Sequence, residues 1–97
     1  MIVRDVFQCK YGRGDDLLAL FREMQGMMPM PAGSRVMTDA SGPFFTIVSE
    51  FPVTDFAAWQ KMNAEEMGNE SFADWFRRMM EVVESGRREF WNVELQV

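Results

Sequence analysis

Trp59 and Asn63 are a pair of residues that could hold an aromatic molecule. They lie four positions apart in a segment, 55–67, whose apolar residues recur with helical spacing. Residues four apart share one face of a helix, so the indole could stack on a ligand while the amide forms a hydrogen bond with it. The alternative, which is commoner, is a core tryptophan beside a surface amide.

Arg4 and Arg88 are the cations best suited to fix a carboxylate or phenolate, because a guanidinium offers a planar fork of donors. Asp39 or Glu50 could act as a general base if burial raised its pKa. The alternative is that these charges pair with one another or with a partner's carboxylate. The full set of candidate ligand-binding residues is Arg4, Gln8, Asp39, Glu50, Trp59, Asn63, Arg88 and Asn92.

The chain has no histidine, which removes the usual general base near neutral pH and the commonest metal and haem ligand. The acids at 65, 66, 81 and 84 fit a solvated helix surface, so we expect no metal site. The spacing Gly12-x-Gly14 lacks the rest of a dinucleotide fingerprint. We therefore expect no metal and no cofactor.

The composition narrows the class of protein. Ninety-seven residues fit one domain, spanning 1–97, with a small core. The formal charge of -5 disfavours nucleic acid as a partner. The single cysteine, Cys9, permits no internal disulfide and fits a reducing, cytoplasmic location. No apolar run is long enough for a membrane span, and none resembles a signal peptide.

The hydrophobic periodicity predicts seven elements. In chain order we expect a strand, a helix, two strands, two helices and a strand, over residues 2–10, 15–28, 34–40, 43–51, 55–67, 71–84 and 87–95. Asn69 or Ser71 is expected to cap the third helix, and Gly86 to end it. The order β-α-β-β-α-α-β is a split βαβ pattern, and it predicts an α+β, ferredoxin-like fold with a four-stranded antiparallel sheet.

Alternation along the strands predicts two different faces of this sheet. The helix face is expected to include Val3, Phe7, Cys9, Val36, Thr38, Phe45, Ile47, Ser49, Phe51, Trp91, Val93 and Leu95, with Asp5 and Glu89 as misfits. The second face is expected to hold Arg4, Val6, Gln8, Arg35, Met37, Asp39, Phe44, Thr46, Val48, Glu50, Arg88, Phe90 and Asn92. For the hairpin we expect Thr46 to face Met37. So much apolar area on the second face predicts that a second copy of the chain covers it.

The third helix carries closely spaced large apolar residues. Trp75, Phe76, Met79 and Met80 are all expected in the core. The ten methionines indicate adaptable packing and are compatible with a soft apolar cavity.

The chain resembles the dimeric α+β barrel superfamily. The likeness lies in the first strand running into Tyr11-Gly12-Arg13-Gly14-Asp15, the leucine-rich first helix, the Ser41-Gly42-Pro43 hairpin, the segment 69–76 and the closing strand from Arg87. Within the superfamily it is most similar to the NIPSNAP-like group, and next to the antibiotic-biosynthesis-monooxygenase-like group. The resemblance covers nearly the whole chain and implies a ferredoxin-like homodimer.

The activities that the resemblance implies are varied. The superfamily includes cofactor-independent monooxygenases, haem-degrading enzymes and isomerases. The haem-degrading members use a histidine ligand, which this chain lacks. The quinone-forming monooxygenases use Trp, Asn, Tyr and Arg around an aromatic substrate, and this chain offers Trp59, Asn63, Tyr11 and Arg88 of the same types.

These observations lead to one main hypothesis and two alternatives. The main one is a cytoplasmic homodimer, joined through the sheet face, that binds a small aromatic or anionic molecule between sheet and helices. The first alternative is a cofactor-independent monooxygenase or isomerase acting on an aromatic or polyketide-like compound. The second is a purely structural dimer with a filled barrel.

Overall fold

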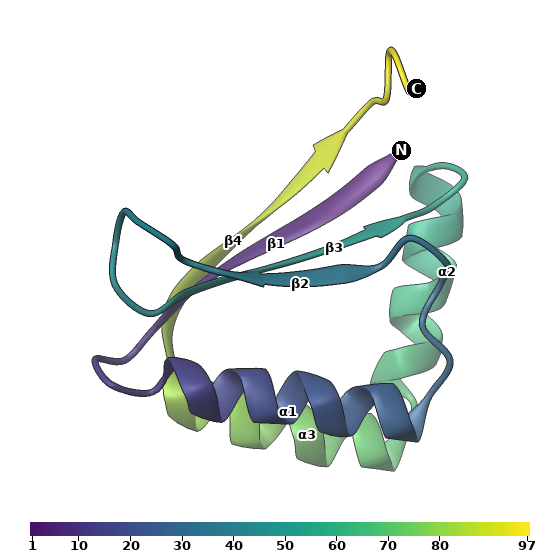
Figure 1. The fold of residues 1–97 in the computed structure, drawn as a ribbon. Coiled ribbons are helices and arrows are strands. Elements are labelled where there is room, and N and C mark those ends of the chain that lie inside the picture. Colours follow the sequence, from purple (N-terminus) through teal and green to yellow (C-terminus); the bar gives the residue numbers. More distant parts are fainter.

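A computed structural model describes all residues, 1–97, and places three helices on one side of a single sheet (Figure 1). The elements are β1 (Ile2–Cys9), α1 (Gly14–Met27), β2 (Arg35–Thr38), β3 (Thr46–Pro52), α2 (Phe56–Met67), α3 (Glu70–Val82) and β4 (Val83–Trp91). The strands are antiparallel in the order β2-β3-β1-β4. The predicted ferredoxin-like α+β fold is confirmed. None of the helices has the length and apolar character needed to cross a membrane.

Side-chain caps set the two helices of the second half-unit. The Asp55 carboxylate accepts a hydrogen bond from the Ala58 amide at 2.8 Å and so begins α2. The Asn69 side chain accepts from the amides of Ser71 and Phe72 at 2.8 and 3.2 Å, as expected for a cap of α3. A new cap directly after α2 lets the chain turn there, so α2 stands upright and spans from the sheet to the layer of α1 and α3 (Figure 1).

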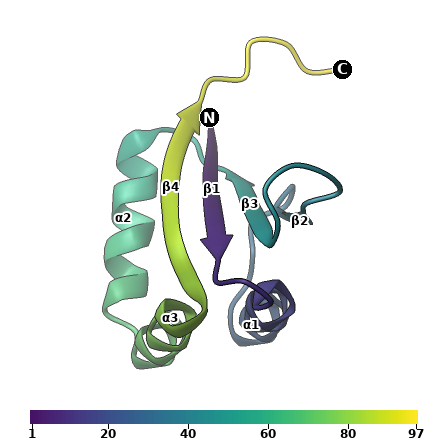
Figure 2. The same cartoon turned by 90° about the vertical axis from the view of Figure 1, so that its left-hand side faces the viewer.

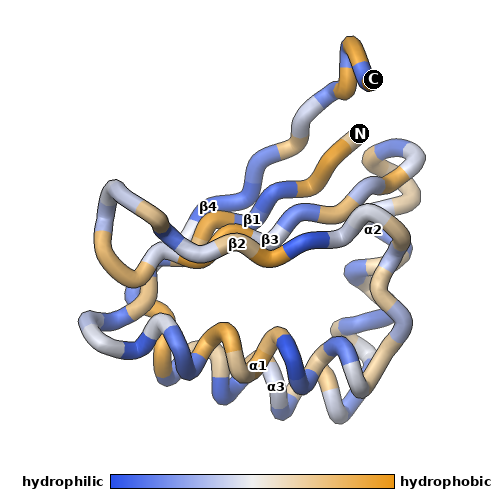
Figure 3. Tube along the Cα trace, viewed as in Figure 1, coloured by the Kyte–Doolittle hydropathy of each residue, from blue (hydrophilic) through white to orange (hydrophobic).

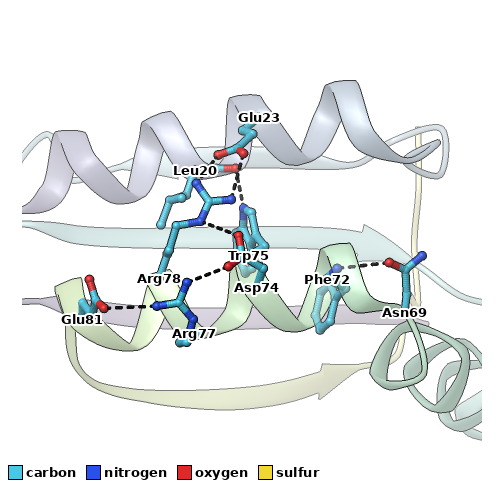
Figure 4. A network of polar contacts seen from close by, with 9 residues as sticks. All are labelled: Leu20, Glu23, Asn69, Phe72, Asp74, Trp75, Arg77, Arg78 and Glu81. Carbon is cyan, nitrogen blue, oxygen red and sulfur yellow. Dashed lines mark hydrogen bonds and ion pairs between the residues drawn. The ribbon is translucent and has the colours of Figure 1, made fainter.

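The core lies where α1 and α3 pack beneath β1 and β3. Leu17, Ile47 and Cys9 are almost fully buried there. Trp75 is also buried, and its indole Nε1 donates a 2.6 Å hydrogen bond to the Leu20 carbonyl of α1 (Figure 4). A bond of this kind satisfies the one polar atom of the indole, so the ring can fill the core without an unmet donor.

Half of the predicted α3 core is wrong. Trp75 and Met79 are buried, whereas Phe76 and Met80 are 37% and 59% exposed. Each exposed residue follows a buried one directly and therefore points about 100° further around the helix. Because α3 contacts α1 and the sheet on one side only, its apolar stripe is wider than the face that is covered.

Ion pairs tie α1 to α3 at the surface. The two terminal nitrogens of Arg78 each donate to a Glu23 carboxylate oxygen at 2.8 Å (Figure 4). Arg78 Nε lies 3.1 Å from Asp74 Oδ2, near enough for an ion pair but not aligned for a hydrogen bond. The pairing with Arg78 holds the pKa of Glu23 below its usual range.

Apolar and polar residues are interspersed along the strands (Figure 3), and sorting them by the alternating direction of their side chains gives the right faces for β1, β2 and β3. The hairpin register differs from the expected one, because Met37 pairs with Val48 and not with Thr46. The connection is longer than a tight turn, and the Asp39 carboxylate caps it by accepting from the Thr46 amide at 3.1 Å. A shift of two residues preserves which face each side chain occupies.

The predicted faces of the closing strand are wrong. Arg88 pairs with Asp5, and Phe90 with Val3, so both lie on the helix face. Arg87, Glu89 and Trp91 lie on the opposite face, which we call the open face. This exchange resolves the two misfits: Asp5 meets a cation on the helix face, and Glu89 leaves that face altogether.

The expected helix face of this strand rested on the apolar residues Trp91, Val93 and Leu95, but β4 ends at Trp91, so two of these three lie outside the strand. The expected role of Gly86 is also wrong. We expected this glycine to end the third helix, but the helix ends at Val82 and β4 has already begun at Val83. Gly86 sits inside β4 opposite Phe7, where an added Cβ would come within 3.1 Å of the Val6 carbonyl oxygen. The glycine therefore serves a close approach of two strands.

Candidate functional site

A cavity of about 590 Å³ lies between the sheet and the helices. Its walls are mostly apolar, with methionine and aromatic side chains from α1, α2 and α3. Its polar lining includes Asp5 and Ser49 from the centre of the sheet, Arg88 from β4, and Asn63 and Glu66 from α2. Ligand sites in proteins have this size and this mixture of apolar walls with a few polar groups.

Helix α2 forms one wall of the cavity and is not a core helix. None of its residues is fully buried, but Trp59, Met62, Asn63 and Glu66 are half-buried. These positions recur at three and four, so they share one side of the helix. Figures 1 and 2 show α2 standing at one end of the strands, and its first turn contacts β4 through the rings of Phe56 and Trp59 against Phe90. One side of α2 thus faces an open space and its other side faces solvent.

Asp5 and Arg88 form a bidentate ion pair at the sheet surface. Arg88 Nε donates to Asp5 Oδ1 at 2.6 Å, and Nη2 donates to Oδ2 at 3.0 Å. Asp5 is only 9% exposed, so the pair gives a buried carboxylate the partner it requires. These hydrogen bonds raise the pKa of the Arg88 guanidinium.

Aromatic rings support the other side of Arg88. Its guanidinium carbon lies 4.9 Å from the centre of the Trp59 ring, a cation–π contact. The Phe90 ring stands edge-on to Trp59 at 5.1 Å, and Phe56 packs 5.2 Å from Phe90. Arg88 is thereby fixed between a carboxylate and an indole, and this fixes the polar end of the cavity.

Glu66 differs from Asp5 and Glu50 because its carboxylate forms neither a hydrogen bond nor an ion pair, and it differs from the exposed Glu65 because it is half-buried. Burial raises the pKa of Glu66, and Asp5 adds to this, while the positive charge of Arg88 opposes it. We expected Glu66 on a solvated helix surface, and this is wrong. The sequence did offer one indication, because residues seven apart share one side of a helix and Glu66 lies seven after Trp59. The indication is weak, since the residue at that position is charged and not apolar.

The structure brings some of the predicted site residues together and separates others. Trp59, Asn63 and Arg88 line the cavity. Glu50 also borders it, but its carboxylate binds Arg4 and Arg35 at 3.1 and 3.0 Å on the open face. Burial would raise the pKa of Glu50, but the hydrogen bonds from the two arginines outweigh it and lower the pKa.

The remaining predicted site residues lie away from the cavity. Gln8 is on the open face, where its amide donates to the Phe44 carbonyl at 2.6 Å. Asp39 caps the hairpin, and Asn92 is exposed beyond the end of β4. Arg4 lies over the Trp91 ring at 5.7 Å on the open face. No group of three His, Cys, Asp or Glu side chains is placed to hold a metal ion.

Solved structures of very low sequence identity share this architecture. A NIPSNAP family protein from Agrobacterium tumefaciens superposes with a TM-score of 0.85 at 11% identity, over 98% of this chain and 87% of that chain. The chain has the fold of these proteins. An uncharacterized NIPSNAP domain protein from Burkholderia xenovorans superposes with a TM-score of 0.81 at 13% identity, over 100% of this chain and 99% of that chain.

The structure of an antibiotic biosynthesis monooxygenase also superposes on this chain, with a lower TM-score of 0.70 at 19% identity, over 96% of this chain and 98% of that chain. No family model matches the sequence, and no curated protein matches it. The resemblance to both groups is thus confirmed for the fold. At these identities the likeness says nothing of activity.

Proposed function

We propose that this protein is a homodimer that binds a small, largely apolar molecule in the cavity between sheet and helices. The observation that carries the proposal is the cavity itself, about 590 Å³ with aromatic and methionine walls and a polar end fixed by Asp5, Arg88 and Trp59. Protein interiors are close-packed and contain few voids larger than a water molecule, so a space of this size is unusual unless a ligand occupies it. The cavity therefore favours binding over the purely structural dimer.

The binding proposal can be tested by filling the cavity. Met62→Trp adds volume on the lined side of α2, and Gln60→Trp adds the same ring on the exposed side of the same helix. Nile red, a neutral dye that fluoresces in apolar surroundings, should bind the unaltered chain and Gln60→Trp alike and should bind Met62→Trp at least tenfold more weakly. Equal binding by the two variants would contradict the proposal.

The open face supports a second copy as the partner. Val6, Met37 and Val48 lie together at its centre. Trp91, opposite Ile2 on the same face, is 52% exposed. Glu50 pairs with both Arg4 and Arg35, which leaves one positive charge beside this apolar centre. Apolar area of this kind on a sheet is typical of an interface, and two copies related by a two-fold axis would each cover the other.

Sedimentation velocity at micromolar concentration tests the dimer. We expect a dimer for the unaltered chain and for Ala73→Asp, which adds a charge at an exposed site on α3. Val48→Asp should give a folded monomer, since it adds an unpaired charge at the centre of the open face. A monomeric unaltered chain would refute the homodimer.

The buried single cysteine also fits a reducing compartment, so we propose the cytoplasm as the location of the protein.

A second candidate function is a cofactor-independent monooxygenase or isomerase acting on an aromatic or polyketide-like compound. What favours it is that Trp59, Asn63 and Arg88 all line one cavity, in a fold shared with an antibiotic biosynthesis monooxygenase. Oxygen uptake with a panel of quinols tests the oxygenase form. We expect uptake above background that falls at least tenfold in Asn63→Ala and not in Asn92→Ala, which lies outside the cavity. No uptake would remove the oxygenase.

A further inference from the structure

The charges around the cavity are unbalanced. Six charged residues border it, four acids and two arginines: Asp5, Arg35, Glu50, Glu65, Glu66 and Arg88. Both arginines are already bound, Arg88 by Asp5 and Arg35 by Glu50. Glu65 and Glu66 remain without a cation. The cavity therefore presents net negative charge to whatever enters it.

The free acids differ in their surroundings. Glu65 is exposed and solvated, whereas Glu66 is half-buried on the side of α2 that lines the cavity. On the helix face of the sheet, the charged groups across the cavity from Glu66 are the paired Asp5 and Arg88. Glu50 and Arg35 border the cavity, but their charges pair with each other on the open face. Helices α1 and α3 contribute no charged side chain to the lining. Arg88 acts on Glu66 only from a distance, and no cation of the chain forms an ion pair with the Glu66 carboxylate.

The other walls suit an organic cation. Trp59 precedes Glu66 by two turns on the same side of α2. Phe21, Phe72, Trp75 and Phe76 line the cavity from α1 and α3. Faces of aromatic rings attract ammonium groups, and cages of such rings bind organic cations in other proteins. An anion would meet arginine donors that Asp5 and Glu50 already occupy, together with repulsion from Glu66.

We propose that the ligand is a hydrophobic ammonium compound whose charged nitrogen pairs with Glu66 while its apolar part fills the aromatic cavity. The inference rests on the proposed ligand-binding function and adds the chemical class. A cation would supply the partner that the Glu66 carboxylate lacks, and it would reverse the cost of keeping that carboxylate out of water. Binding should accordingly favour the ionised form of Glu66 and release a proton where the free carboxyl is partly protonated.

Three probes of one shape test the class of ligand: 1-naphthylmethylammonium, 1-naphthalenemethanol and 1-naphthoate. Calorimetric titration near neutral pH and low salt should show the ammonium binding about tenfold more tightly than the alcohol, with the carboxylate weakest. Glu66→Gln should remove most of the preference for the ammonium and leave the alcohol unchanged. Glu84→Gln removes an exposed acid outside the cavity and should change the preference by less than about twofold.

The outcomes separate the two proposals. If the alcohol binds as tightly as the ammonium, or if Glu66→Gln keeps the full preference, the cation class is wrong and the binding cavity stands. If none of the three probes binds, the proposed binding function fails, and the cation class fails with it. Titrations at mildly acidic pH, in buffers of different ionisation enthalpy, add a second readout, because the ammonium should there release protons with the unaltered chain and none with Glu66→Gln.

Discussion

Arg88 binds both carboxylate oxygens of Asp5 from the neighbouring strand, at 2.6 and 3.0 Å. The two residues face each other across the β1–β4 pairing, on the side covered by helices. Each alone would be costly there, since one is a buried acid and the other a cation above the half-buried indole of Trp59. Together they form a rigid polar end for a cavity whose remaining walls are mostly apolar.

The Asp5–Arg88 pair should behave as a unit in unfolding experiments. Arg88→Met leaves a buried carboxylate without donors and should lower the free energy of unfolding by about 1–3 kcal/mol. The double change Asp5→Leu with Arg88→Met should recover much of this loss, because apolar groups of similar size often replace a buried pair without cost. Urea denaturation of the single and double variants measures the coupling.

Arg87→Met serves as the control for that cycle. Arg87 pairs with Glu89 on the open face and is largely exposed, so its loss should change stability by no more than about 0.5 kcal/mol. Equal effects at 87 and 88 would show that the Asp5 pair has no special role in the fold.

Glu66→Gln should stabilise the protein in a way that depends on pH. The pKa of Glu66 is raised in the folded state, so the folded chain holds this proton more tightly than the unfolded chain. Stability from this group is therefore present below the unfolded pKa and is lost as pH rises through the folded pKa. Removing the charge should raise the free energy of unfolding at neutral pH by on the order of 1 kcal/mol.

The same substitution should have little effect in acid, below the usual pKa of a glutamate, since the carboxyl is then protonated in both states. Thermal unfolding across the pH range, for the unaltered chain and the variant, gives the difference directly. A constant difference at every pH would show that Glu66 acts through packing and not through its charge.

Two glycines should respond in opposite directions to alanine. At Gly86 an added Cβ would lie 3.1 Å from the Val6 carbonyl oxygen, so Gly86→Ala should cost about 1–3 kcal/mol as the strands move apart. At Gly26, near the end of α1, the added methyl meets nothing within 4 Å, and Gly26→Ala should stabilise by up to about 1 kcal/mol. Matching signs in urea denaturation would contradict the close approach of β1 and β4 at Gly86.

The buried indole of Trp75 should matter more than the indole on the open face. Trp75→Phe removes the donor to the Leu20 carbonyl and leaves a space, so we expect a loss of about 1–3 kcal/mol. Trp91→Phe alters an exposed ring and should change monomer stability by less than about 0.5 kcal/mol. A comparison of thermal unfolding for the two variants, in the same oligomeric state, checks the difference.

The order of elements and three of the four strand faces could be predicted from the sequence, because each depends on local periodicity. Apolar residues at three and four specify a helix, and alternation specifies the faces of a strand. The prediction is wrong for β4, because the helix face was assigned to the apolar residues Trp91, Val93 and Leu95, and the strand ends at Trp91. The expected role of Gly86 as the end of a helix is also wrong. Gly86 is compatible with both roles, and the choice depends on the Val6 carbonyl, which lies far away in the chain.

The candidate site was predicted only in part, for a related reason. Trp59, Asn63 and Arg88 could be selected by residue type, and they do line the cavity. Asp5 could not be recognised as the partner of Arg88, because their pairing depends on the register of two strands 83 residues apart. Glu66 was missed because a half-buried acid in a helix has the same local pattern as a solvated one.

The sequence by itself determined the order of helices and strands and so the fold, because each element is predicted by the spacing of apolar residues that are close together in the chain. Only the tertiary structure decided which charges meet, which acid remains without a partner, and that a space remains between sheet and helices. These features depend on distances between elements, and such distances arise from how whole faces pack. The chemistry proposed for Glu66 follows from that packing, because an unpaired carboxylate has meaning only when its surroundings are known.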